Sequence, residues 1–469
     1  MKREAIGKWQ DVTLTDLFFA FRKAKADCFF ERSICIANQF AEYEKDLARN
    51  LTDLLSRLHA NEITEVLLEN IGQTRVVAKK LGTERKPPKK KMAISEGHSF
   101  FSDPARAFEI LCVSHDLVPE FRLIGDFPVA MHVLSALWIN LVGHKFDAVL
   151  TKSAYGSRLR RYRPEPGAPK ESVGAYHLEA VGSFQPYFGP YKEWRSRGLN
   201  SIRTELKAHH AVIAISMDLT SYYHRIDPSF IADSRFHTHA GISLSEWELG
   251  FTTAFADILV EWSRRVAHEM HVLGCRKKDV SVGGLPIGLS ISRVVANVLL
   301  VGLDKDIEQG LTPVYYGRYV DDLFLVLRDP GNLVTAEALL AHIASRTRSF
   351  PHPEEINNGD IFLRLAGGFQ AKTQLLLQQG KQKTFFLQGL GGLDLLSNIE
   401  SQIRSVSSER RLMPSPDRLE SMASAKVLTA AGHASEEVDT LRRADGLSVR
   451  RLGWSVQLRA VETLARDLR

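Results

Sequence analysis

Three aspartates have the type and spacing needed for metal-assisted phosphate chemistry. Asp218 directly follows a short apolar run, and Asp321 and Asp322 stand side by side between two further apolar runs. Adjacent carboxylates repel each other, so a site that gathers three of them suits a hard cation such as Mg²⁺. Two such ions can stabilise the attacking and the leaving oxygen of an in-line phosphoryl displacement. An isolated Asp-Asp pair is more often a plain turn, so the interpretation depends on its surroundings.

The elements that must position these carboxylates are predicted to be strands. Residues 211–217 (AVIAISM) form an apolar run that predicts a buried strand with Asp218 at its carboxyl end. Residues 314–320 and 323–327 are two strand-like runs separated by the aspartate pair. They predict a β-hairpin that carries the pair at its tip.

The rest of the sequence alternates helical patterns with basic and aromatic loops. Apolar spacing predicts helices within 15–58, 246–273, 290–303 and 400–469. The basic run 79–91, with two adjacent prolines, predicts an exposed loop that either grips phosphates or is a solvated face. The loops 155–161 and 187–191 interleave aromatic and cationic residues, which suits either stacked bases or an internal aromatic contact.

Composition places the chain among ordinary globular proteins. It has 469 residues, 44% hydrophobic and 25% charged, and Lys plus Arg exceed Asp plus Glu by 61 to 55. The small basic excess favours polyanionic partners. The four cysteines lack zinc-ligand spacing, so we expect reduced thiols. The N-terminus has no signal-peptide pattern and the apolar stretch 129–142 is too short to span a bilayer, so we expect a cytoplasmic protein with no membrane partner.

In order and spacing, these features resemble the motifs of reverse transcriptases, over about residues 215–392. Asp218 with Tyr223 is similar to motif A, residues 285–297 to motif B, and the YVDD of 319–322 to motif C. Residues 371–375 (AKTQL) resemble the lysine-bearing motif D, and 386–389 (FLQG) fall where the primer grip, motif E, is expected.

The resemblance implies a role for each matching residue. Asp218 and Asp321 would be the principal ligands of Mg²⁺, or of Mn²⁺, with the Leu219 carbonyl and the Asp322 carboxylate completing the metal site. Tyr223 would be the steric gate that excludes a ribose 2′-hydroxyl and so selects deoxynucleotides.

Four further residues would contact or shape the nucleotide site. Gly288 and Ser292 would shape the motif B loop, Lys372 would lie near the triphosphate and protonate the leaving pyrophosphate, and Arg158 would hold the triphosphate from the fingers. Ile287 stands where motif B usually has glutamine, which removes a polar group near the template.

The expected fold is α+β, a right-hand polymerase with a palm sheet, fingers, and helical N- and C-terminal regions. The predicted parts are a helical region at 1–78, a basic linker at 79–100, fingers at 101–205, a palm at 206–392 and a thumb-like helical region at 393–469. Residues 461–468 continue a helical pattern without a stop signal, as expected of a C-terminally shortened chain.

The expected activity is RNA-directed DNA synthesis from dNTPs. Softer likeness in the N-terminal part, including residues 16–25 and 136–140, is to bacterial antiviral defence reverse transcriptases. That likeness implies an RNA template, a DNA product, possible use of a dedicated noncoding RNA, and a homo-oligomer or protein partner. Two alternatives remain open: untemplated or protein-primed DNA synthesis at the same site, and a non-catalytic RNA-binding scaffold with a polymerase fold.

Other polar residues are expected to have no part in the chemistry. His209, His210, His237 and His239 lack the partners of a zinc site. Asp304, like Asp306, follows the motif B helix and is expected on its solvated face.

Overall fold

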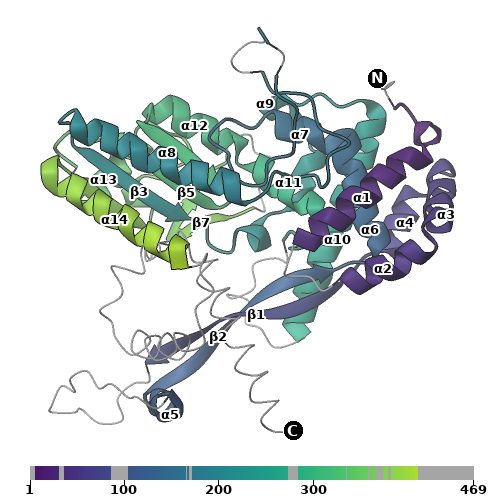
Figure 1. The fold of residues 1–469 in the computed structure, drawn as a ribbon, viewed down its shortest axis with the longest axis horizontal. Coiled ribbons are helices and arrows are strands. Elements are labelled where there is room, and N and C mark those ends of the chain that lie inside the picture. The colour runs from purple at the N-terminus through teal and green to yellow at the C-terminus, as the bar shows by residue number, and fades with distance from the viewer. Residues whose placement is uncertain are drawn as a thin grey trace. The chain divides into compact units, whose positions relative to one another are not determined.

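A computed structural model describes residues 6–30, 36–85, 104–164, 166–167, 172–272, 284–333, 335–356, 360–365, 373–378 and 382–409 of the chain. In these ranges the protein is α+β, with many helices and small antiparallel sheets (Figure 1). It divides into two compact units, residues 1–77 with 123–387 and residues 78–122 with 388–469. Each unit therefore joins segments that are distant in sequence.

The first unit contains the sheet that positions the aspartates. Its four strands lie in the order β4-β5-β3-β8, and all neighbours are antiparallel. The strands are β3 (Val212–Asp218), β4 (Tyr315–Tyr319), β5 (Asp322–Arg328) and β8 (Lys383–Leu387). The predicted strand before Asp218 and the predicted hairpin around the aspartate pair are both confirmed.

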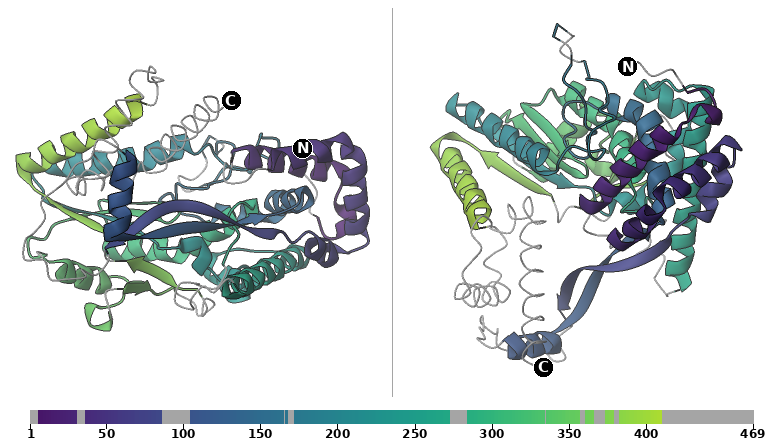
Figure 2. Two further views of the ribbon diagram at one scale, coloured as in Figure 1. Left: turned by 90° about the horizontal axis from the view of Figure 1, so that it is seen from below. Right: turned by 45° about the vertical axis from the view of Figure 1, so that its right-hand side comes forward.

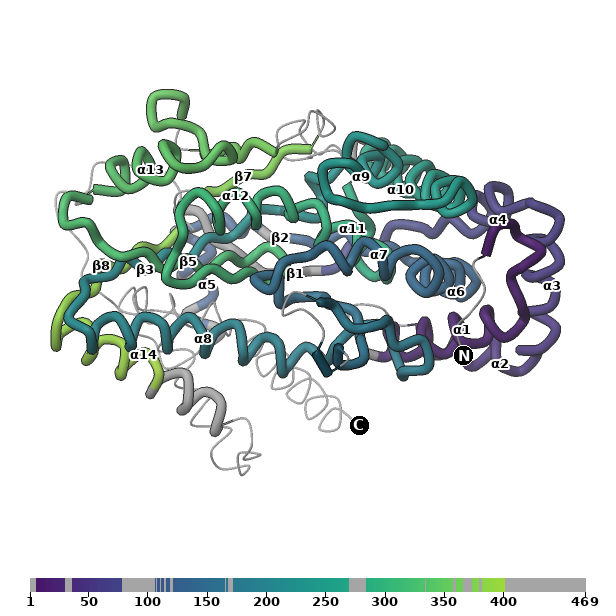
Figure 3. The backbone as a smooth tube through the Cα atoms, turned by 90° about the horizontal axis from the view of Figure 1, so that it is seen from above, coloured from purple at the N-terminus to yellow at the C-terminus, as the bar shows by residue number. Residues whose placement is uncertain are grey.

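The two faces of this sheet meet different helices. Ile213 and Ile215 of β3 and Leu325 of β5 join the main core, which also contains side chains of α11 (Ser290–Leu299) and α12 (Val301–Leu311). The other face meets α8 (Phe188–Lys207), which lies along the sheet (Figure 3). Gly198 of α8 allows this approach, because a Cβ there would lie 2.1 Å from a ring atom of Phe324.

Helices build the remainder of the first unit. Apolar residues spaced along the first helix, Leu17, Phe21 and Cys28, are buried in the core. The long helix α10 contacts α4 and runs beside the N-terminal helices (Figure 2). These helices are α1 (Leu14–Phe30), α2 (Ala37–Lys45), α3 (Leu47–His59), α4 (Ile63–Glu69), α6 (Val129–Trp138), α7 (His144–Ala148), α9 (Ser234–Ala240), α10 (Glu246–Val272) and α13 (Ala336–Ala344).

A second, two-stranded sheet in the first unit is formed by strands that lie between β5 and β8 in the sequence. It pairs β6 (Asp360–Leu363) with β7 (Leu375–Gln378) in antiparallel register. Short 3₁₀ or π turns complete the regular structure, at Trp9–Asp11, Ile139–Gly143, Tyr222–Arg225, Pro228–Ala232 and Pro353–Glu355.

The second unit contains a long ribbon that the sequence does not reveal. β1 (Gln73–Arg85) pairs with β2 (His115–Asp126) (Figure 1), and residues 78–85 and 115–122 of these strands belong to the second unit. The basic loop expected from residue 79 is therefore wrong as far as Arg85, because β1 pairs with a partner strand thirty residues further along the chain. The unit also holds α5 (Pro104–Ser114) and α14 (Gly389–Glu409). Most of the predicted tail helix lies outside the described residues.

Candidate active site

The three aspartates converge at one end of the four-stranded sheet. Asp218 ends β3, Asp322 begins β5, and their Cα atoms are register partners across the two strands. Asp321 lies in the turn that joins β4 to β5, and its carbonyl accepts a hydrogen bond of 3.1 Å from the backbone N–H of Leu219. Strand pairing thus brings residues about one hundred positions apart into adjacent places.

The carboxylates of this cluster carry like charges, and burial and mutual repulsion both affect the protonation of Asp322. Burial raises the pKa of the Asp322 carboxyl well above its usual range, and the nearby Asp321 and Asp218 carboxylates raise it further. Among the residues that the structure describes, no three His, Cys, Asp or Glu side chains are gathered as a bound metal ion would require.

The turn that carries Asp321 has an unusual backbone. Val320 has a φ of 61°, a left-handed conformation that a β-branched residue rarely adopts. Gly156 packs directly against it, since a Cβ at position 156 would lie 2.8 Å from the Val320 nitrogen and 3.1 Å from the Tyr319 carbonyl carbon. The path of the turn therefore depends on contacts from outside the hairpin.

Tyr223 and the motif B segment are joined to each other. Tyr223 lies in the 3₁₀ turn after β3, half-buried, and its carbonyl accepts a 2.8 Å hydrogen bond from the Leu285 N–H. Gly284, with a φ of 66°, leaves no room for a side chain against the Tyr223 carbonyl. The end of β3 thus fixes the start of the segment that leads to α11.

Gly288 and Ser292 have different environments in this segment. Gly288 has a φ of 111°, so the bend before α11 requires glycine there. Ser292, in the first turns of α11, is fully buried, so its hydroxyl does not line an open site. The expectation that Gly288 and Ser292 shape this segment at the nucleotide site stays a prediction.

The guanidinium of Arg158 donates hydrogen bonds to acceptors within the protein. Its Nε donates to Oδ1 of Asp147 at 3.0 Å, Nη1 donates to the carbonyls of Thr151 and Ala154 at 3.0 and 3.1 Å, and Nη2 donates to the Asp147 carbonyl at 3.3 Å. Asp147 also binds Arg161. Four of the five N–H groups of Arg158 therefore hold this loop together, and triphosphate binding by Arg158 stays a prediction.

Lys372 lies outside the described residues, as does Ala371 before it. The residues that follow are close to the end of β3, because Thr220 donates its N–H to the Leu376 carbonyl at 2.8 Å. Of the motif E segment, Phe386 and Leu387 lie in β8, the edge strand paired with β3. Residues 373–376 thus run beside the residues that follow β3, and Gln374 donates its N–H to the Arg225 carbonyl at 3.3 Å.

Aromatic side chains cover the sheet next to the aspartates. Tyr319, the cross-strand partner of Asp322, packs against Tyr187, Tyr191 and Trp194, with ring centroids 5.4, 5.2 and 6.1 Å away. Burial raises the pKa of Tyr319, and the neighbouring Tyr187 raises it further, so its phenol stays neutral. The internal aromatic contact is therefore the correct alternative for Tyr191 and Trp194, which are buried, while Tyr187 is partly exposed.

A buried ion pair beneath the hairpin was missed. Arg318 of β4 and Asp304 of α12 have no exposed surface, and Arg318 Nε lies 2.7 Å from Oδ1 of Asp304. The expectation of a solvated Asp304 is wrong, because α12 turns this residue toward the sheet. The sequence does contain a signal for this ion pair, because Arg318 is a charged residue within the apolar pattern of the hairpin.

The remaining polar candidates do not form a second site. His237 is buried and its Nε2 contacts the Ile231 carbonyl, while His210 pairs with Glu205. Cys28 is buried with Sγ 3.3 Å from Nδ1 of His132. Cys112 is only half-buried, and the other two cysteines lie outside the described residues.

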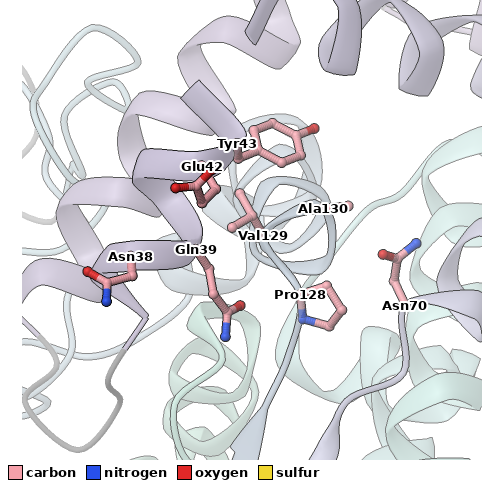
Figure 4. Close-up of a pocket in the computed structure, with 8 residues that line it drawn as sticks. All are labelled: Asn38, Gln39, Glu42, Tyr43, Asn70, Pro128, Val129 and Ala130. Carbon is pink, nitrogen blue, oxygen red and sulfur yellow. The ribbon is translucent and has the colours of Figure 1, made fainter. Parts of the chain in front are cut away.

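A shallow hollow of about 510 Å³ lies between α2 and the start of α6 in the first unit (Figure 4). Its only charged lining residue is Glu42, which forms an exposed ion pair with Lys45. The three aspartates do not line it. The hollow therefore lacks the groups that the predicted chemistry needs.

Comparison with known proteins does not add to these observations. The chain matches no protein-family model and no curated protein sequence. Within the described ranges, no helix is both long enough and apolar enough to cross a membrane.

Proposed function

We propose that this protein is a reverse transcriptase that adds dNTPs to a primer along an RNA template. The observation that carries the proposal is the convergence of Asp218, Asp321 and Asp322 at one end of an antiparallel sheet. The sequence order of the matching motifs supports it. In this proposal the four-stranded sheet is the palm, within residues 206–392.

The donor atoms at this site fit Mg²⁺ or Mn²⁺. Carboxylate and carbonyl oxygens are the ligands that such cations prefer, and they would come from Asp218, Asp321, Asp322 and Leu219. A cation would also offset the like charges that raise the pKa of Asp322. Binding would require the carboxylates to turn toward one point. The bound ions would supply charge neutralisation at the attacking and leaving oxygens.

The chain's own residues would orient the substrates for this displacement. The primer 3′-oxygen forms a bond to the α-phosphorus of the dNTP, and the bond to pyrophosphate breaks. Tyr223 would stand against the sugar and exclude a 2′-hydroxyl. Lys372 would give a proton to the departing pyrophosphate.

The proposed partners follow from the same likeness. They are an RNA template, with a dedicated noncoding RNA as one source, a DNA product, and a second copy or another protein. The proposed setting is antiviral defence in the bacterial cytoplasm. The basic excess of the chain suits an RNA partner.

The test is to sequence the DNA made by purified protein with Mg²⁺ and all four dNTPs, together with the RNA that copurifies. Asp321→Ala is the inactive variant, and Asp257→Asn on the exposed face of α10 is the matched control. The proposal predicts DNA complementary to that RNA from the wild type and the control, and none from Asp321→Ala. DNA without an RNA counterpart would indicate untemplated or protein-primed synthesis. RNA binding without any DNA would indicate the scaffold function.

A further inference from the structure

The buried ion pair of Arg318 and Asp304 connects directly to the turn that carries Asp321. Arg318 Nε donates to both carboxylate oxygens of Asp304, at 2.7 and 2.9 Å. Neither side chain reaches solvent. A charge pair buried in this way is tolerated only when the remaining donors of the arginine also find acceptors.

Those remaining donors lead to the turn. Nη1 of Arg318 donates to Oδ1 of Asn297 at 2.5 Å and lies 3.4 Å from the Val320 carbonyl, and Nη2 donates to the Asn297 carbonyl at 2.8 Å. Asn297 in turn donates its Nδ2 to the Gly156 carbonyl at 2.9 Å. The network therefore encloses the turn from two sides, through Val320 and through Gly156.

The turn needs such support because its own sequence disfavours it. Val320 adopts a left-handed conformation that its branched side chain opposes. The next residue is Asp321, whose carbonyl binds Leu219 beside Asp218. A shift of the turn would move one carboxylate relative to the others.

We propose that Arg318, Asp304 and Asn297 are positioning residues that hold the Val320–Asp321 turn in the path required for metal binding. The importance of that path to catalysis rests on the proposed polymerase function. Stability alone does not explain why this ion pair is present, because a well-packed apolar pair of similar volume generally makes a protein as stable as a buried ion pair does. An apolar pair could not make the hydrogen bond from Arg318 Nη1 to the Val320 carbonyl in the turn.

The experiment removes both charges together. Arg318→Met with Asp304→Leu leaves no unpaired buried charge. It does leave the Tyr316 hydroxyl and Asn297 Oδ1 without these partners, so the unfolding midpoint in urea is expected to fall moderately while the chain stays folded. The matched control is Arg328→Met with Glu205→Leu, the same exchange at a pair between β5 and α8 whose arginine is exposed to solvent. Tyr316→Phe removes only a hydroxyl that donates to Asp304 at 2.8 Å, and keeps the network.

Two readouts separate positioning from general stability. Hydrogen exchange measured without metal should be at least about tenfold faster in peptides covering Leu219 and the turn, and unchanged elsewhere. The rate of DNA synthesis should fall about 10- to 100-fold, and the Mg²⁺ concentration for half-maximal rate should rise, as when support is removed from a ligand. Both controls should match the wild type.

Each other outcome has a definite meaning. Wild-type exchange at the turn in the double variant, or wild-type activity and Mg²⁺ dependence, would overturn the proposal. If the double variant does not fold, Asn297→Leu, which keeps the ion pair, must show the same local exchange. If the wild type makes no DNA, the polymerase function fails, while the exchange comparison still decides whether the network holds the turn.

Discussion

Gly198→Ala in α8 tests how closely this helix packs on the sheet beside the aspartates. Alanine favours a helix over glycine by about 1 kcal/mol, so the substitution would stabilise an exposed helical site. At position 198, however, the new Cβ would lie 2.1 and 2.5 Å from two ring atoms of Phe324 and 3.0 Å from a ring atom of Tyr315. Something must move, and overpacking of this kind typically costs about 1–3 kcal/mol.

The ring of Phe324 cannot move away easily. It packs against Trp194 and Tyr315, with centroids 6.3 and 5.7 Å away. We therefore expect Gly198→Ala to lower the free energy of unfolding by up to about 2 kcal/mol, because the cost of overpacking exceeds the gain in helix propensity.

The matched control is Gly250→Ala in α10, where a Cβ would meet nothing within 4 Å. That variant is expected to be stabilised by up to about 1 kcal/mol, so the two identical substitutions should have opposite signs. Urea denaturation followed by far-ultraviolet circular dichroism measures both. Equal stabilisation by the two variants would refute the close packing of α8 on β5.

Three further results are expected. Asp322→Asn should raise the thermal stability in EDTA, by about 0.5–2 kcal/mol, because it removes a carboxylate whose pKa is raised by burial and by two like charges; unchanged or lower stability would contradict the repulsion. Tyr223→Ala should raise incorporation of ribonucleotides relative to deoxynucleotides at least about tenfold in single-nucleotide extension assays, and unchanged selectivity would reject the steric gate. Burial lowers the pKa of His132 and of His144 to about 4. Between pH 6.5 and 4, these side chains therefore bind a proton in the unfolded chain but not in the folded chain. Stability should therefore fall as the pH falls through that window, by as much as about 3 kcal/mol per histidine, and His144→Phe should flatten the urea-midpoint profile.

The aspartates could be predicted because their signals are local. An apolar run that ends in Asp218 and a two-residue interruption between two strand patterns are both visible within a few residues. The pairing of Asp218 with Asp322 then follows from placing two buried strands side by side in one sheet. Strand pattern and carboxylate spacing agree, which is why this part of the fold was predicted correctly.

The roles of charged residues could not be predicted, because a charge does not reveal its partner. Arg158 lies in a basic loop of the kind that binds phosphate, yet Asp147, eleven residues earlier, already holds it. Asp304 follows a helix whose solvent side is not evident from the pattern, and its partner Arg318 is fourteen residues further along the chain. In both cases a contact between separate elements decides the role.

The ribbon of β1 and β2 could not be predicted for a similar reason. Val76 and Val77 favour a strand, but the following basic residues resemble a solvated loop until a partner strand is known. Pairing with β2 makes residues as far as Arg85 part of a strand. The prolines that supported the loop prediction come only after that residue.

The division of the second unit between two distant segments has a consequence for synthesis. Residues 78–122 leave the ribosome about 265 residues before residue 388 is made. At 5–20 residues per second, this delay is about 15–50 s. During that time the first unit can acquire all of its segments, whereas the second unit has only one of its two. The order of translation therefore makes the ribbon unit the last part of the protein to be completed, because its early segment must wait for residues 388–469.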